Sequence, residues 1–326
     1  MQNPTSRIPI DFCQYVQSRE SALQAHMVGG IPDYAFGMDF SLRKRLRAIP
    51  LLYKLCLSYA AYIVPRMKKE LEAECICVGP KQYPEIYKIT QECARTLGIG
   101  IPTVYIKPDL ANINAGAFAT DDVSPLIVIN SALVERFTLD ELRFVIGHEC
   151  GHIHNLHSVY SIAADLLVSG GMTAGAMGGL PNGLLALMNL STTMALKTWA
   201  RAGEVTCDRA GIICCVEYDT ALSSFEKMMT GGMMNNSTRA NMDELKKQYE
   251  SIRKAPTKLL ELTFSHPVVI RRILAAKEFM NSDAYYQWHP EKKTAGMTMT
   301  SHDELDRLCN EYISIVGTNT SRKGGM

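Results

Sequence analysis

The chain has 326 residues, of which 47% are apolar and 21% are charged, a composition typical of soluble globular proteins. Its formal net charge of +1 provides no overall attraction to nucleic acid, so we expect no nucleic-acid partner. The ten cysteines include no C-x-x-C pair, and the N-terminal sequence MQNPTSRIPIDF lacks the basic and apolar regions of a secretory signal. These features favour a reducing compartment, and we predict a cytoplasmic protein.

The first 70 residues have a helical pattern and contain one strongly apolar stretch, Ile49 to Val64. This stretch lies between Pro50 and Pro65, carries Lys54, and is shorter than the ~20 apolar residues that a membrane span requires. We therefore expect an amphipathic or buried helix. The basic residues that precede it would also suit a membrane surface, so membrane association stays open as an alternative that we do not favour.

A small β-sheet is predicted after a helix over Pro84–Leu97, which ends at Gly98. Three short runs rich in β-branched residues follow and are separated by Pro, Asp and Asn, as expected for strands. The predicted strands are Thr103–Lys107, Ala115–Thr120 and Leu126–Asn130.

The helix after these strands has a clear start signal. Thr138 and Glu141 have the spacing of a capping box, and Phe137 can pack against Leu142 as a hydrophobic staple. The pattern predicts that this helix continues to about His157.

Residues 162–196 are apolar and contain a single charge, Asp165. Pro181–Gly183 divides this segment into two pieces that are each too short for a span, so we prefer a pair of buried helices to a membrane-inserted hairpin. A further helix is predicted over Thr198–Glu217, and Gly231–Thr238 is predicted to be a mobile loop. The remainder is expected to be helical, with breaks after Asn281 and near Pro290.

The predicted helix that begins at Thr138 carries the sequence His148-Glu149-Cys150-Gly151-His152, an H-E-x-x-H pattern. Residues four apart share one face of a helix, so both imidazoles can reach one metal ion. Glu149 is rotated by about 100° from His148, which places its carboxylate beside the ion as a general base for the attacking water. We interpret Cys150 as a packing residue.

A hydrolytic zinc site also needs a third protein ligand. An H-E-x-x-H-x-x-G-x-x-H site fails, because Asn155 and Ser158 stand where it requires Gly and His. Glu204 on a later helix is the candidate instead. Asp208 shares its helical face and can accept a hydrogen bond from a ligand histidine. Two further histidines, His154 and His157, are interpreted as helix-surface or structural residues.

Four sequence blocks in the same order resemble metallopeptidase family forty-eight, which includes the HtpX proteases, the CAAX prenyl endopeptidases and the Oma-type proteases. The blocks are Asn114-Ala115-Gly116-Ala117-Phe118, Glu141 to His157, Arg201 to Gly211, and His266-Pro267 with Arg272-Ile273. The resemblance covers about residues 80 to 280. Two departures are the inserted Gly116 and Cys207, which replaces the usual alanine.

The resemblance implies an α+β, mainly helical, zincin-like fold, in which the edge strand of a small sheet flanks the active-site helix. It implies one Zn²⁺ ion held by His148, His152 and Glu204, with Glu149 as base and Asp208 behind a ligand. His266 is either near the developing oxyanion or a packing residue. Asn114 to Phe118 would bind an extended substrate.

We therefore predict a zinc metalloendopeptidase that cleaves peptides or unfolded proteins, since no G-x-M-E-N exopeptidase strand is present. The expected parts are an N-terminal helical segment (1–75), a peptidase domain (76–285) and a C-terminal helical tail (286–326). Two alternatives remain: a membrane-associated HtpX-like protease, and a latent or chaperone-like zinc protein whose site is covered by residues 231–238 or by the tail.

Overall fold

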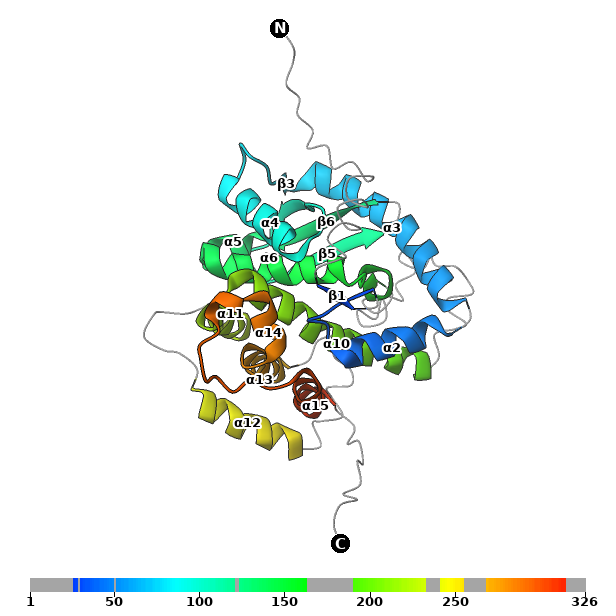
Figure 1. The fold of residues 1–326 in the computed structure, drawn as a ribbon. Helices are drawn as coiled ribbons and strands as arrows, with labels where there is room; N and C mark the ends of the chain where they lie inside the picture. The colour runs from blue at the N-terminus through cyan, green and yellow to red at the C-terminus, as the bar shows by residue number, and fades with distance from the viewer. Residues whose placement is uncertain are drawn as a thin grey trace.

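The computed structural model describes residues 26–28, 30–49, 51–120, 123–162, 190–232, 241–254 and 268–314. Helices dominate, and they cover both faces of a small sheet (Figure 1). The helices are α2 (Gly37–Arg47), α3 (Leu52–Glu74), α4 (Pro84–Leu97), α5 (Ser131–Arg136), α6 (Leu139–His154), α10 (Leu190–Cys215), α11 (Tyr218–Thr230), α12 (Met242–Lys254), α13 (Val269–Met280), α14 (Asp283–Trp288) and α15 (His302–Ile313). The strands are β1 (Met27–Val28), β2 (Ile31–Pro32), β3 (Ile76–Cys77), β4 (Thr103–Lys107), β5 (Ala115–Thr120) and β6 (Val123–Asn130).

The four-stranded sheet has the order β3-β4-β6-β5, so β5 is an edge strand. Strand β4 is parallel to β6, whereas β3 and β5 pair antiparallel with their neighbours. The three strands predicted from the sequence are confirmed, although β6 begins at Val123 rather than at Leu126. A separate two-stranded ribbon joins β1 and β2.

Strands β4, β5 and β6 divide their side chains between two apolar clusters, because successive residues point to opposite faces of a sheet. On β4, Val104 and Ile106 belong to the cluster that contains residues of α4 and α6. Tyr105, between them, belongs to a second cluster with residues of α3. The sheet therefore lies between α4 and α6 on one face and α3 on the other.

Helix α3 includes residues 52–64 of the apolar stretch Ile49–Val64, and it continues through Pro65. The prolyl residue is exposed, while Val64 and Leu71 on either side of it are buried, so packing of the apolar face continues the helix beyond it. In the described part of the chain, no individual helix is both long and apolar enough to cross a membrane. The pair α2 and α3, bent by 98°, meets that test only when the two helices are taken together.

Helix α6 begins as its sequence predicts. The Thr138 side chain accepts a hydrogen bond from the Glu141 N–H at 3.3 Å, and the Thr138 N–H donates to Glu141 Oε2 at 2.7 Å. The helix ends at His154 rather than near His157, because Leu156 takes the left-handed conformation with φ of +57°. Residue 157 therefore lies beyond the helix, and its side chain is not constrained to a helical face.

Small residues let α6 and α10 approach closely. A Cβ atom added to Gly147 would lie 2.6 Å from Cys214 Cβ, and one added to Gly151 would lie 2.7 Å from Ala210 Cβ. From the other side, a Cβ atom on Gly211 would lie 2.8 Å from the Phe144 carbonyl oxygen. We call this contact the glycine seam (Gly147, Gly151, Ala210 and Gly211). It holds the helix with the H-E-x-x-H sequence close against the helix that carries Glu204.

The C-terminal helices pack on the same core as α6 and α10. The breaks predicted after Asn281 and near Pro290 are confirmed by the ends of α13 and α14. Helix α10 extends from Leu190 to Cys215, beginning before and ending slightly before the predicted limits of 198 and 217. Within the described ranges every cysteine is free. The predicted helix pair over 162–196 and the loop over 231–238 fall mostly outside the described residues.

Candidate metal centre

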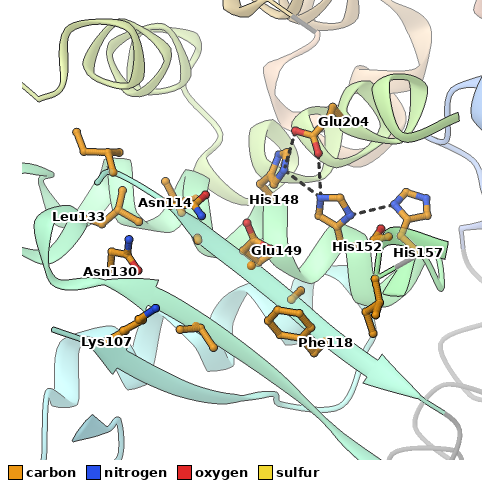
Figure 2. A pocket seen from close by; sticks show the side chains of 18 of the residues that line it. Lys107, Asn114, Phe118, Asn130, Leu133, His148, Glu149, His152, His157 and Glu204 are labelled. Atoms are coloured by element: carbon orange, nitrogen blue, oxygen red, sulfur yellow. Dashed lines mark hydrogen bonds and ion pairs between the residues drawn. The ribbon is translucent and has the colours of Figure 1, made fainter. Parts of the chain in front are cut away.

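Two helices bring three candidate ligands together (Figure 2). His148 Nε2 and His152 Nε2, from α6, lie 3.2 Å apart. Glu204, from α10, has one carboxylate oxygen 3.6 Å from His148 Nε2 and the other 3.5 Å from His152 Nε2. The glycine seam explains this convergence, because Gly151 lies between the histidines on the face of α6 that touches α10.

On the side of its ring opposite Nε2, His148 contacts Asp208, which is in turn bound by Arg272. Asp208 Oδ1 lies 3.0 Å from His148 Nδ1. Arg272, on α13, donates from Nε to Asp208 Oδ2 at 2.8 Å and from Nη2 to Asp208 Oδ1 at 2.6 Å. Its Nη1 also lies 3.1 Å from Glu204 Oε2, so one guanidinium fixes both carboxylates. Burial would lower the pKa of Arg272, but the charges of Asp208 and Glu204 raise it above its usual value.

The far side of His152 faces a third imidazole. His157 Nδ1 lies 3.2 Å from His152 Nδ1, and His157 Nε2 lies 3.0 Å from Asp39 Oδ2 on α2. The helix-surface interpretation of His157 is wrong, because its ring is buried and the end of α6 at His154 turns it back toward His152. The structural interpretation of this residue holds. Burial lowers the pKa of His157 despite the nearby Asp39 carboxylate, which favours the neutral ring.

The three ligand atoms fit a zinc ion. Zinc is bound at about 2.0–2.2 Å by imidazole nitrogen and carboxylate oxygen, which places neighbouring ligands of a tetrahedral ion about 3.3 Å apart. The two Nε2 atoms lie 3.2 Å apart, Glu204 Oε2 lies 3.6 Å from that of His148, and Glu204 Oε1 lies 3.5 Å from that of His152, all close to this spacing. The donor set of two imidazoles and one carboxylate is also one that zinc hydrolases use.

Cys207 is a rival third ligand. The Cys207 sulfur, one nitrogen of His148 and one nitrogen of His152 all lie within 4.8 Å of one another. However, Cys207 Sγ lies 3.5 Å from His157 Nδ1, the atom that faces His152 Nδ1. The sulfur therefore contacts the imidazole of His157, whereas the Glu204 oxygens face the Nε2 atoms of His148 and His152. Burial and the charge of Glu204 also raise the pKa of the thiol well above its usual value.

A cavity of about 670 Å³ reaches from this cluster to the edge strand β5. Glu149 is 5% exposed and lines the cavity together with His148 and His152. Figure 2 shows β5 running past these side chains. The predicted substrate residues Asn114 to Phe118 all line the same cavity.

The backbone of β5 presents alternate residues to the cavity side. The Asn114 carbonyl accepts a hydrogen bond from the Asn130 N–H at 3.0 Å, so residue 114 faces β6. The Ala119 N–H instead donates to Ser158 Oγ at 2.9 Å, away from β6. By this alternation Ala115 and Ala117 turn their N–H and C=O groups outward, where an extended peptide can pair with them.

The charges of the cluster suit a cation. Burial would lower the pKa of His152, but its hydrogen bond and charge interaction with Glu204 raise it above the ordinary value, and Glu149 adds to this. The carboxylates therefore favour positive charge at the His152 nitrogen. A divalent cation competes with the proton for that position and benefits from the same field.

Sequence reasoning missed three residues of this site. One feature of the sequence could have indicated Asp39: it is the single acidic residue between Tyr34 and Lys69. Arg272 lies in a block that matches the family, which gives it no role by itself, and Cys207 stands out only because it departs from the family pattern. His266 lies outside the described residues, so its placement stays a prediction.

Comparison with known proteins agrees with this geometry. The model of Peptidase family M48 matches residues 80–280. The chain belongs to peptidase family M48. This confirms the family predicted from the four sequence blocks and, together with the mainly helical architecture, the zincin-like fold. M48 proteins are metal-dependent peptidases, so the chain is a metallopeptidase with peptide or protein substrates.

Individual members of the family share about 30% of their residues with this chain over the aligned regions. The chain is similar to the plastoglobule-localized metallopeptidase 48 of the Arabidopsis thaliana chloroplast, with 27% identity over 262 residues, covering 78% of this chain and 74% of that protein. It is also similar to an HtpX protease homologue of Thermoplasma volcanium, with 31% identity over 134 residues, covering 41% of each chain. No solved structure matches. The predicted cytoplasmic location is not confirmed by these relatives.

Proposed function

We propose that this M48 peptidase is a zinc-dependent endopeptidase in which His148, His152 and Glu204 hold the ion and Glu149 is the general base. The observation that carries the proposal is the 3.2–3.6 Å convergence of two imidazoles and one carboxylate beside Glu149. A structural zinc site has no use for a further carboxylate beside its ligands, whereas hydrolysis does.

Each side chain of the site has a separate role in the proposed hydrolysis. Zinc supplies a Lewis acid that polarises the scissile carbonyl and makes water more acidic. Glu149 takes a proton from the attacking water and passes it to the leaving amine. Asp208 accepts a hydrogen bond from His148 Nδ1, which leaves Nε2 unprotonated and directed toward Glu204. Arg272 keeps the Glu204 carboxylate in place.

Substrate binding is proposed to use the edge of β5. Ala115 and Ala117 would pair with the backbone of an extended peptide beside Glu149. Recognition through backbone groups is tolerant of sequence, which suits peptides and unfolded proteins. A cavity that continues along the strand also accommodates chain on both sides of a cleaved bond, which favours internal cleavage.

The test combines metal analysis with cleavage of unfolded casein by the purified full-length chain. Wild type should contain one zinc ion and lose activity with a chelator, and zinc should restore it. Glu149→Gln should keep the zinc and lose about 10²–10⁴-fold in kcat, because only the proton transfer is removed. An active Glu149→Gln variant would contradict the role of the base.

Two variants decide the third ligand. Glu204→Gln should bind zinc more weakly, whereas Cys207→Ala, which introduces the residue usual in the family, should retain zinc and activity. The reverse result would make Cys207 the ligand. If both variants keep their zinc, the ion is held elsewhere.

A further inference from the structure

Asp39 is a fully buried carboxylate that lies outside the region matched by the family. It belongs to α2, near the start of the described chain. Asp39 Oδ1 accepts a hydrogen bond from Trp199 Nε1 at 2.9 Å, and Oδ2 accepts one from Thr206 Oγ1 at 2.8 Å. Its remaining contact, 3.0 Å from Oδ2, is His157 Nε2.

These contacts determine where the hydrogen atoms of two imidazoles lie. An ionised carboxylate can only accept hydrogen bonds, so His157 Nε2 carries the proton that points at Asp39. In a neutral ring, Nδ1 of His157 is then an acceptor. Two donors face this atom, His152 Nδ1 at 3.2 Å and the Cys207 thiol at 3.5 Å, and His152 is the nearer. With the proton of His152 on Nδ1, the lone pair of its Nε2 is directed at Glu204 and His148 (Figure 2).

We propose that Asp39 is a positioning residue for the metal centre, acting through His157 to fix the tautomer and the ring orientation of His152. The inference rests on the proposed function, in which His152 is a zinc ligand. Asp208 contacts the ring of His148 directly. Asp39 would orient the ring of His152 in the same way, but through the imidazole of His157. Helix α2, outside the family match, thereby completes the metal site.

Asp39 also has a purely architectural use, because Trp199 and Thr206 tie α2 to α10 through the same carboxylate. The two roles differ in one respect. If Asp39 acts through His157, the loss of Asp39 matters to zinc only while His157 is present. If Asp39 only anchors α2, its loss has the same effect with or without His157. A double-mutant cycle separates these cases.

The experiment measures zinc affinity of the full-length, metal-free chain by competition with a chromophoric chelator. Asp39→Asn and His157→Gln should each weaken zinc binding about 10–100-fold, as loss of partners behind metal ligands does. The double variant should bind no more weakly than His157→Gln alone. Thr206→Val is the control for anchoring of α2: it removes a donor to the same carboxylate and the acceptor of the Phe36 N–H, leaves His157 in place and should keep wild-type affinity.

The possible outcomes are distinct. Wild type without zinc affinity overturns the proposed function and this inference with it. Wild type that binds zinc, with Asp39→Asn unchanged or with additive losses in the double variant, overturns the inference alone. Circular dichroism of the metal-free variants checks folding. If Asp39→Asn does not fold, His157→Gln carries the test, and unchanged affinity there overturns the inference.

Discussion

The two walls of the cavity differ in how they are packed. The wall formed by α6 and α10 is buried and close-packed across the glycine seam, and it carries His148, His152 and Glu204. The opposite wall, residues 115–118 of β5, is half-buried and turns backbone groups outward. Metal ligation needs fixed side chains, whereas pairing with a peptide backbone needs only an accessible strand. The proposed chemistry and the proposed recognition thus lie on walls that differ in packing.

Removal of the buried guanidinium should have the largest effect on the first wall. Arg272→Met leaves Glu204 and Asp208 without their cationic partner, and breaking such a buried pair costs about 3–5 kcal/mol of the free energy of unfolding. Urea unfolding of the metal-free protein measures it. Zinc should restore part of the loss, because the ion replaces some of the missing positive charge.

Lys277→Met, on the same helix but outside the cavity, is the control for Arg272 and should change stability little. A loss below about 1 kcal/mol in Arg272→Met would mean that the pair contributes no more than a surface ion pair.

Matched glycine substitutions compare the walls directly. Gly151→Val should lower the free energy of unfolding by about 1–3 kcal/mol through overpacking, since even a Cβ atom would lie 2.7 Å from Ala210 Cβ. Gly116→Val on β5 should be tolerated, because its Cβ would meet only the Phe118 ring at 3.5 Å. Thermal unfolding of both variants checks this. Equal losses would contradict the difference in packing.

A smaller effect is expected from a change at the substrate edge. Ala117→Pro removes one outward N–H without breaking a bond to β6, because proline is accepted where the strand N–H faces away from the sheet. Loss of one hydrogen bond to the peptide should raise KM about 3–10-fold and leave zinc content unchanged. Ala117→Ser keeps the N–H and should behave as wild type. A normal KM in Ala117→Pro would place the substrate elsewhere.

Much of this arrangement follows from local sequence signals. The capping box at Thr138 fixes the start of α6, and the four-residue spacing of His148 and His152 fixes their common face. The positions of β4 and β6 follow from short β-branched runs. Such signals depend on neighbours in the chain, which is why they can be read without the fold.

Other features depend on contacts between distant segments. His157 points at His152 because the chain reverses at Leu156, and no helical periodicity predicts that reversal. Asp39 contacts His157, 118 residues further along the chain, and no local sequence signal predicts that contact. Helix α3 continues through Pro65 because its packing outweighs the local preference to stop.

The glycine seam has a consequence for the life of a newly synthesised chain. His148 and Glu204 belong to segments that meet only once α6 has docked on α10, and the seam tolerates little error in that docking. An emerging polypeptide holding only α6 has the H-E-x-x-H sequence but lacks Glu204. Under the proposed ligand set, hydrolytic capacity would therefore arise only after α6 has docked on α10.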